Sequence, residues 1–584
     1  MQIHFRRWYS LVFIILIAAL SLSARELPNF NLLDTHDKNH ELYRAEGKAI
    51  VLFFTGTHCP VAQESVLTIK SLKETFKDQG VDFWVINSYA DESKEDITTE
   101  IEQLGLDRIT YLLDRNQVVA LSHGIKRTAE VIAIDTFTWE VFYRGAVDNQ
   151  FNDNSEKPLA SENYLSDAIQ QFLKGEAVTE PKTHAHGSLI SYAQVAENLE
   201  APDYTTQVAP ILRSHCVDCH RNGGIGPWAM ASHRRVSNYS NMIEEVLLTR
   251  RMPPWDPHPD YGQFKNDSSL SREEIQTLIR WVKAGSPKNA DHDPMTDPLP
   301  EKAKWSLGQP DAILRLPTIQ TIAATGIEPY HHLVVENPFK EDVWLRGIDI
   351  NPTNNSVVHH AVLFANWSNS PNKHGTLGTY MHGWAPGVSP LEFPDGVAKL
   401  LPANSTLTVE MHYTTNGEEQ TDRTEVALYL ADTSIEREAE TRIAINFDLD
   451  IPPGAEDARH MASYAFENPG TIYGLFPHMH YRGKWMRYDL LLPNGTEETL
   501  LHVPRYDFQW QHSYFLETPK HVPAGSWLVV TGSFDNSVRN PANPDPTQPV
   551  FYGEQSWDEM FVGFFEIADD PKPSSIRKRR RFNR

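Results

Sequence analysis

The chain has 584 residues, of which 40% are hydrophobic, and a formal net charge of -24. A single hydrophobic core stops growing at about 250 to 300 residues, so this length predicts several domains. The negative charge argues against a general nucleic-acid partner or an anionic membrane surface. The one basic run, residues 577–581 within a tail at 571–584, is expected to be solvated.

The first 24 residues have the layout of a secretory signal peptide. Arg6 and Arg7 precede the apolar run Leu11–Leu20, and the small residues Ser23 and Ala24 follow it. An uncleaved anchor needs about 20 apolar residues, so this run is short for a membrane span. We therefore expect a periplasmic or secreted protein without an integral membrane domain. A retained N-terminal anchor is the less favoured alternative.

Residues 25–175 are expected to form an α/β domain. The run Lys48–Phe54 is a continuous apolar strand, the string GTHCPVA follows it, and a helix with apolar residues on one face comes next. Alternating strands and helices favour an α/β sheet, and a helix N-terminus would lower the pKa of Cys59 at the strand-to-helix turn. This region resembles the thioredoxin-like redoxin and peroxiredoxin group.

Two positions depart from that group. Ala62 stands where the redox motif has its second thiol, and Ala129 stands where thioredoxin-like proteins usually carry a cis-proline. A one-cysteine peroxidase, with Cys59 as the redox thiol and Arg127 as a helper, is one interpretation. A degenerate domain kept for packing or docking is the other. Residues 176–202 are polar and without a period, which indicates a linker.

Residues 203–290 contain the string CVDCH, which is the attachment motif of a c-type haem. Cys216 and Cys219 would bond to the haem, and His220 would ligate its iron. Met252, in RRMPPW, would be the second axial ligand, a Met/His pairing that raises the haem potential. Two other methionines are available for this role, Met230 and Met242.

A helix is predicted after this motif. Ser271 and Glu274 form a capping box, apolar residues then recur at helical spacing, and Gly285 ends the helix. The region resembles a small all-α cytochrome c domain of class I type, so one covalently bound haem c is expected. A zinc-binding or redox Cys-x-x-Cys site is the alternative.

The remaining half has short alternating strands and frequent turns, which are typical of all-β sandwiches. Its length favours two jelly-roll-like sandwiches, at 305–440 and 441–570. Residues two apart on a strand share a face, so His478 and His480 present two imidazoles to one point. Imidazole suits zinc, copper, iron or nickel, and a thioether from Met560 would shift the choice toward copper. We call His478, His480 and Met560 the His/Met cluster.

A second set is formed by His359, His360 and His412, the three-histidine cluster. Neighbours on a regular strand face opposite ways, so His359 and His360 can reach one ion only if the backbone is irregular there. The adjacent pair His331 and His332 lies in PYHHLVV and is expected on an ordinary strand surface.

Five strings of this half, in order, resemble the type II copper, ascorbate-dependent monooxygenases, the family typified by dopamine beta-hydroxylase and peptidylglycine alpha-hydroxylating monooxygenase. They are VVHHAVLF, HGWAPGVSPLEFP, TVEMHYTTN, FPHMHYRGK and WDEMFVGFFE. The resemblance implies two copper ions. The three-histidine cluster would hold the electron-transfer copper, and the His/Met cluster would hold the catalytic copper across an open cleft. Unlike the animal enzymes, this half has no cysteine.

The resemblance implies hydroxylation of a C–H bond of a small-molecule or peptide substrate by O2. The family takes electrons from ascorbate, whereas here we expect the fused haem to pass electrons from an external donor to the three-histidine cluster. Two alternatives remain open. One is an electron-transfer or one-cysteine thiol peroxidase protein with inactive copper-binding domains, and the other is an exported copper-binding scaffold.

Overall fold

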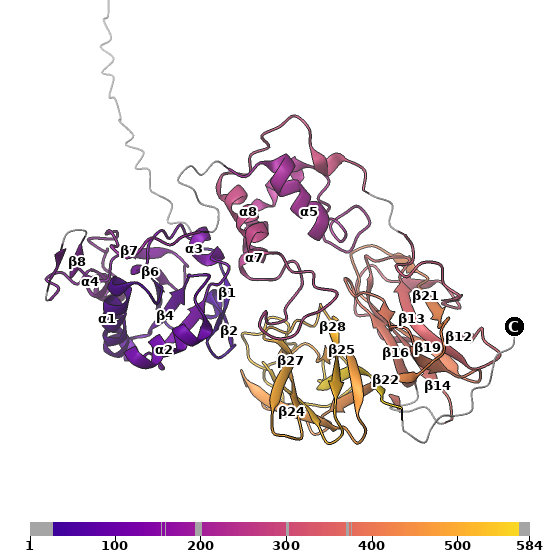
Figure 1. The fold of residues 1–584 in the computed structure, drawn as a ribbon. Helices are drawn as coiled ribbons and strands as arrows, with labels where there is room; N and C mark the ends of the chain where they lie inside the picture. Colours follow the sequence, from indigo (N-terminus) through magenta and orange to yellow (C-terminus); the bar gives the residue numbers. More distant parts are fainter. Residues whose placement is uncertain are drawn as a thin grey trace, which may run out of the picture. The chain divides into compact units, whose positions relative to one another are not determined.

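The structure is a computed structural model in which the chain forms two compact units (Figure 1). The first unit contains residues 41–192, and the second contains residues 193–584 together with 30–40. The expected signal peptide and basic tail lie outside the described residues. None of the described helices combines the length and the apolar character that crossing a bilayer requires. The described residues are 27–152, 155–157, 159–192, 201–299, 303–368, 373–374 and 377–571.

The first unit is the predicted α/β domain. Its sheet has the central order β5-β4-β3-β6-β7. Strand β3 is buried at every position, because its sequence AIVLFFT is apolar throughout, as in strands covered on both faces. It runs parallel to β4 and antiparallel to β6. The strands are β3 (Ala49–Thr55), β4 (Val81–Asn87), β5 (Thr110–Leu113), β6 (Glu130–Asp135) and β7 (Val141–Gly145), and the helices are α1 (Pro60–Phe76), α2 (Lys94–Leu104), α3 (Val118–Ser122) and α4 (Tyr164–Leu173). The short strands β8 (Phe151–Asn152) and β9 (Ser155–Glu156) also belong to this unit, whereas β1 (Asn31–Asp34) and most of β2 (Asn39–Glu41) fall within residues 30–40, which are grouped with the second unit.

The expected linker at 176–202 is wrong in its first part. Residues 176–192 belong to the α/β domain, where Ile190 is buried and its amide donates to the carbonyl of Lys126. The Thr183 hydroxyl contacts the Tyr143 hydroxyl at 2.6 Å. The segment is held by such individual hydrogen bonds, so no periodic pattern marks it in the sequence. Its last part, 193–200, lies outside the described residues.

The second unit starts with a helical region. The predicted capping box is present, because the Ser271 hydroxyl accepts from the Glu274 amide and the Glu274 carboxylate accepts from the Ser271 amide. Helix α8 buries Leu278, Ile279 and Trp281 on its inner face. The helices are α5 (Ala209–His215), α6 (His233–Asn238), α7 (Ser240–Leu248) and α8 (Arg272–Lys283).

The loop between α7 and α8 contains a stretch that we call the docking segment, residues 255–266. Trp255 and Phe264 belong to the hydrophobic core of the second sandwich. The Lys265 amide donates to the Phe515 carbonyl at 2.9 Å, and Phe264 pairs with Leu516 in an isolated bridge. Figure 1 shows the loop running from α7 toward β27 and β28. The helical region is therefore anchored in the second sandwich by core side chains and backbone hydrogen bonds.

The second half is rich in strands, as predicted, and has two hydrophobic cores, each between two sheets. The first core lies under the sheet β12-β19-β14-β16-β15, and the second lies under β24-β29-β26-β27. The strands of these sheets are β12 (His331–Val335), β14 (Val358–Asn366), β15 (Lys373–His374), β16 (Gly378–Trp384), β19 (Thr406–Tyr413), β24 (Ala458–Ala465), β26 (Gly483–Leu491), β27 (Glu497–Val503) and β29 (Trp527–Phe534).

A single nine-stranded sheet closes both cores, in the order β10-β21-β13-β18-β22-β31-β25-β28 with β17 beside β13. The two halves of this sheet are joined by the parallel pairing of β18 with β22 at Val397 and Ala398. Its strands are β10 (Ala312–Arg315), β13 (Val343–Asn351), β17 (Leu391–Glu392), β18 (Val397–Leu401), β21 (Glu425–Leu430), β22 (Arg437–Ile445), β25 (Gly470–His478), β28 (Tyr514–Val522) and β31 (Val562–Asp569). Two short pairs remain, β11 (Gln320–Ile322) with β20 (Gln420–Asp422) and β23 (Asp450–Ile451) with β30 (Val550–Phe551).

Candidate metal centres

The three-histidine cluster is assembled by two neighbouring strands. His359 and His360 lie at the start of β14, His412 lies near the end of β19, and His360 is the cross-strand neighbour of His412. One ring nitrogen from each residue lies within 4.8 Å of the others. The structure therefore brings together all three residues that the sequence analysis grouped.

A backbone irregularity lets both adjacent histidines join the cluster. The pairing of β14 with β19 shifts register between Val358 and His360, and such a shift reorients side chains that would otherwise alternate. As a result, the Nδ1 atoms of His359 and His360 lie 3.1 Å apart.

The hydrogen bonds of the three-histidine cluster indicate that its Nδ1 atoms are the ones available to bind a metal. Nε2 of His359 donates to Oε1 of Gln509 at 3.1 Å, so the lone pair of that ring is on Nδ1. Nδ1 of His412 is buried and has no hydrogen-bond partner among the described residues. Burial lowers the pKa of all three rings, with His412 at about 3, so they are neutral at physiological pH, which is the form that binds a metal. Three neutral ring nitrogens that lie close together are a donor set suited to a metal cation.

The histidines of the His/Met cluster lie at the end of β25. The ring centroids of His478 and His480 are 5.2 Å apart and the rings are perpendicular. Nδ1 of His478 donates to Oε1 of Gln511 at 2.8 Å, and Nδ1 of His480 faces the Asp558 carbonyl at 3.4 Å. Because the Nδ1 atoms of His478 and His480 carry the protons in these contacts, the lone pairs of both rings are on their Nε2 atoms. Burial lowers the pKa of His480 to about 3, so this ring is also neutral.

Met560 lies in the segment before β31, which is hydrogen-bonded to the backbone of this cluster through the preceding residue, Glu559. His478, the last residue of β25, pairs with Val562, the first residue of β31, and Met560 lies two residues before Val562 in the chain. The Glu559 carboxylate accepts from the amides of His480, at 2.8 Å, and Arg482, at 2.6 Å. Burial raises the pKa of Glu559 to about 8, and these amides oppose the rise. Met560 itself is buried, as a thioether ligand in a protein interior would be.

The two clusters share neighbours. The Phe508 ring lies 5.3 Å from His359 and 6.0 Å from His480. The Tyr330 ring lies 4.7 Å from His412, and its hydroxyl contacts Ser556, four residues before Met560, at 3.1 Å. Phe508 therefore lies beside one histidine of each cluster. The open cleft that the family resemblance implied between the clusters stays a prediction.

The turn Phe508–His512 was not identified from the sequence. Its two glutamines each orient one ring, Gln509 in the three-histidine cluster and Gln511 in the His/Met cluster. The turn has no helical or strand period, so the only available signal was the pair of glutamines around Trp510.

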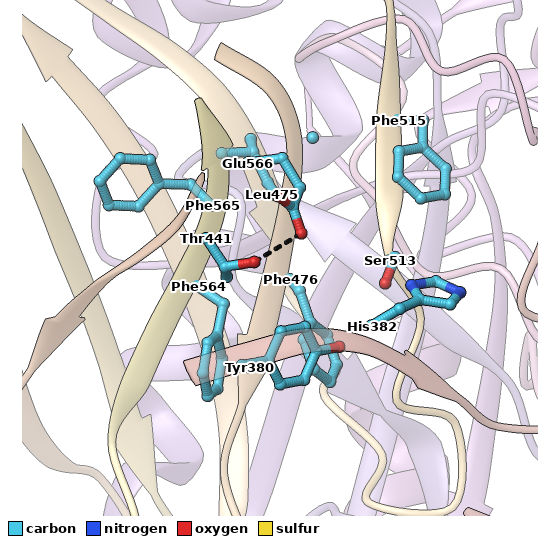
Figure 2. A pocket seen from close by; sticks show the side chains of 11 residues that line it. Tyr380, His382, Thr441, Leu475, Phe476, Ser513, Phe515, Phe564, Phe565 and Glu566 are labelled. Atoms are coloured by element: carbon cyan, nitrogen blue, oxygen red, sulfur yellow. Dashed lines mark hydrogen bonds between the residues drawn. The ribbon is translucent and has the colours of Figure 1, made fainter. Parts of the chain in front are cut away.

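A narrow pocket adjoins the His/Met cluster (Figure 2). Phe476 and Phe564 line it, and their rings lie 6.2 and 6.1 Å from His478. The pocket also has a polar part, where Nε2 of His382 and Oε2 of Glu566 are buried without a hydrogen-bond partner among the described residues. The other Glu566 oxygen, Oε1, accepts from Nζ of the buried Lys399 at 2.9 Å.

The CVDCH motif forms a tight turn after α5. The His220 amide donates to the Cys216 carbonyl at 2.9 Å, which places both cysteines and the histidine on one turn. Nδ1 of His220 donates to the Trp228 carbonyl at 3.0 Å, so the Nε2 lone pair is oriented for a metal, as iron ligation requires. No disulfide joins any of the three cysteines. These residues fit a covalently attached haem.

The methionines near this turn differ in exposure. Met252 is half-buried, and its amide donates to the Val246 carbonyl at 3.3 Å. Met242 is 49% exposed, which disfavours it as an iron ligand, whereas Met230 is buried and its amide donates to the His220 carbonyl. Met252 and Met230 are therefore the better-placed candidates.

Cys59 caps the N-terminus of α1. Its sulfur accepts from the amides of Ala62 and Ser188, both at 3.4 Å. Burial alone would raise the pKa of Cys59, but hydrogen bonds from Ser188, Thr128 and Ala62 outweigh it, and the pKa is lowered. Arg127, the expected helper, donates instead to the Gly187 carbonyl. Ser188 was missed in the sequence because it lies in the supposed linker, where His184 and His186 also pack against each other at 4.8 Å.

A family model described as Redoxin matches residues 23–157. The thiol-disulfide oxidoreductase ResA of Halalkalibacterium halodurans is 27% identical over 117 residues, which are 20% of this chain and 65% of that protein. ResA of Bacillus anthracis is 28% identical over 101 residues, which are 17% of this chain and 57% of that protein. The chain thus spans less than two thirds of the length of these relatives.

Two solved structures are similar in part. An uncharacterized conserved protein from Geobacillus kaustophilus is 24% identical, with 30% of this chain and 93% of that chain covered and a TM-score of 0.27. The thioredoxin domain of a thiol-disulfide oxidoreductase from Bacteroides vulgatus is 18% identical, with 26% and 96% covered and a TM-score of 0.21. From the family match, the ResA relatives and the fold, the N-terminal part of this chain is a thioredoxin-like redoxin domain.

Proposed function

We propose that the protein is an exported, copper-dependent monooxygenase that uses O2 to hydroxylate a C–H bond of an organic substrate. The observation that carries the proposal is the pair of adjacent donor sets. One offers three nitrogens, and the other offers two nitrogens together with the buried thioether of Met560, whose neighbour Glu559 is hydrogen-bonded to the His480 amide. Nitrogen with thioether is a donor set that favours copper. Export rests on the signal-like N-terminus.

Two copper ions would be held, one by the Nδ1 atoms of the three-histidine cluster and one by His478, His480 and Met560. When bound, they would supply the one-electron chemistry that activates O2 and breaks the C–H bond. The chain contributes orientation, because Gln509 and Gln511 fix the ring tautomers and the Glu559 carboxylate holds the backbone of His480. Phe508 and Tyr330 pack against the rings of His359 and His412 and would help to hold them in place.

The narrow pocket beside His478, which has room for about one water molecule in this structure, would have to open for a substrate to be held there. Its walls carry the aromatic rings of Tyr380, Phe476 and Phe564, which suit an apolar or aromatic body. Nε2 of His382 and Oε2 of Glu566 offer hydrogen-bonding atoms to a polar group of the substrate. We therefore propose a small, mainly apolar substrate with one hydrogen-bonding end.

Electrons would come from an external donor through a haem c on Cys216, Cys219 and His220, with Met252 as the second axial ligand. The orientation of His220 by the Trp228 carbonyl supports this assignment. The helical region is anchored in the sandwich that holds the His/Met cluster, so the haem would be a fixed part of the oxygenase half.

Metal analysis and O2 uptake test the proposal. The purified protein is expected to contain two copper ions and one haem per chain and to consume O2 with small aromatic substrates and a reductant. Met560→Ala should abolish turnover and keep copper in the three-histidine cluster. Met461→Ala, at a methionine that is 59% exposed, is the matched control. Full activity of Met560→Ala, or a protein without copper, would refute the proposal.

A second function is favoured by the redoxin domain. Its relatives are named thiol-disulfide oxidoreductases, and the pKa of Cys59 is lowered by its hydrogen bonds. With no second thiol at Ala62, a one-cysteine peroxidase is the form that this site supports. The Cys59 thiolate would attack the peroxide O–O bond, giving a sulfenic acid and water, and an external thiol would restore it. Peroxide consumption that is lost in Cys59→Ser, with unchanged O2-dependent turnover, would establish this separate activity.

A further inference from the structure

The docking segment carries an aromatic side chain from the helical region into the second sandwich. Trp255 is 7% exposed, and its ring lies 5.2 Å from Tyr514 and 6.3 Å from His512. In the sequence, Trp255 follows Met252 after two prolines only. The proposed axial ligand and the core of the sandwich are thus connected by a very short stretch of chain.

His512 has an environment that packing alone does not explain. It is 4% exposed, and neither of its ring nitrogens meets the distance and angle of a hydrogen bond to any described residue. Burial lowers its pKa to about 4, and the Pro254 carbonyl, which faces the ring, only partly opposes this. A buried ring whose nitrogens are incompletely hydrogen-bonded costs stability, which makes this histidine a candidate for a role beyond packing.

The residues just before His512 lead to both clusters. Gln511 accepts from Nδ1 of His478, and Gln509 accepts from Nε2 of His359. A continuous series of contacts therefore runs from Pro254 through His512 and Gln511 to His478. The corresponding series of contacts to His359 passes through Gln509, so it includes two more residues of the turn.

We propose that Trp255 and His512 form the entrance of an electron path from the helical region. The path reaches the His/Met cluster first, which differs from the delivery to the three-histidine cluster that was expected from the sequence. The proposal rests on the proposed function, because it requires the haem and the copper ions to be present. In the step itself, one electron leaves a ferrous haem iron, which becomes ferric, and reduces one Cu(II) to Cu(I). No bond forms or breaks and no proton is transferred.

The path can be tested by the rate of anaerobic electron transfer in the full-length protein. Haem and copper contents are first measured for the wild type and each variant. The haem of the Cu(II) protein is then reduced by a pulse of a one-electron reductant, and its reoxidation is followed by haem absorbance while the Cu(II) signal is followed by electron paramagnetic resonance.

Three variants distinguish a path from simple docking. His512→Leu and Trp255→Leu should both slow haem reoxidation and the loss of the Cu(II) signal, with unchanged metal content. Phe264→Leu removes another ring from the same docking segment, but this ring contacts Trp255 and Tyr514 and not His512. It should transfer electrons at the wild-type rate.

Wild-type rates in His512→Leu would overturn the path, and so would equal slowing by Phe264→Leu and Trp255→Leu, since that result would reflect loosened docking. A wild-type protein that lacks haem or copper would instead refute the proposed function, and the metal analysis reveals this before any rate is compared. If His512→Leu folds poorly, the haem reoxidation rates of Trp255→Leu and Phe264→Leu can still be compared, and this comparison distinguishes an electron path from docking.

Discussion

The Nδ1 atoms of His359 and His360, two consecutive residues of one strand, lie 3.1 Å apart. Regular strand geometry would direct these rings to opposite faces, and the register shift after Val358 is what turns them together. Because Nε2 of His359 is the donor to Gln509, its Nδ1 lone pair points toward the second ring. The two Nδ1 atoms are therefore close enough for one cation to bind both.

The two glutamines of the turn should control the two clusters separately. Gln509→Ala removes the acceptor that fixes the tautomer of His359, and Gln511→Ala does the same for His478. Loss of such an orienting partner weakens metal binding about 10- to 100-fold. Titration of Cu(I) against a competing chelator should therefore show one weakened site in each variant. Gln548→Ala, at an exposed glutamine, should bind copper as the wild type does; equal weakening of both sites in each variant would contradict the assignment.

Acid should destabilise the metal-free protein. His412 and His480 have a pKa of about 3 when folded, mainly through burial, whereas the pKa of an unfolded histidine is about 6.5. The unfolded chain therefore binds more protons between these values. Stability is complete above about pH 6.5 and falls toward pH 3, by up to about 1.4 kcal/mol per pH unit for each ring.

Urea unfolding of the metal-free protein at several pH values measures this slope. His412→Asn removes one of the buried rings whose pKa is lowered and should give a shallower decrease between pH 6 and pH 4 than the wild type. An identical slope in the variant would show that His412 is already charged in the folded protein.

Haem attachment should depend on two of the three cysteines. Cys216→Ala with Cys219→Ala removes both thiols of the CVDCH turn, so no haem should remain bound after denaturing electrophoresis, while both clusters keep their copper. Cys59→Ala should retain the haem, because this cysteine lies in the redoxin domain. Covalent haem in the double variant would contradict the prediction.

The lowered pKa of Cys59 should depend on Ser188. Ser188→Ala removes the side-chain hydrogen bond to the sulfur and leaves the one from the amide, so the pKa of Cys59 should rise toward its ordinary value. The pH dependence of alkylation measures this in a Cys216→Ala, Cys219→Ala background, where Cys59 is the only thiol. Ser191→Ala, at an exposed serine of the same segment, is the control; an unchanged midpoint in Ser188→Ala would exclude this role.

Local sequence patterns predicted the helices and strands that have a periodic or continuous run of apolar residues or a recognisable helix-capping sequence. Strand β3 follows from its apolar run, and α8 from Ser271, Glu274 and its apolar spacing. The histidines of both candidate sites were grouped by strand spacing and by the family resemblance. For the adjacent pair, the sequence could state that the backbone must be irregular, but the register shift itself depends on pairing with β19.

The residues that support the sites could not be found in this way. Gln509, Gln511 and Ser188 act through single hydrogen bonds to residues far away in the chain, and they lie in irregular segments. Such contacts are determined by tertiary structure, so neither propensity nor spacing marks them. The polar character that suggested a linker at 176–192 reflects these hydrogen bonds to the domain.

The docking segment also bears on how this chain could have been assembled from separate ancestors. Because Trp255 and Phe264 fill part of the second sandwich core, a β-rich half expressed from residue 305 onward would have two cavities in its interior and an uncovered edge along β28. The helical region is thus packed into the β-rich half and not merely linked to it by the chain. The helical region has become a structural subunit of the β-rich half, so we expect the two to unfold in a single cooperative transition and to be inherited together.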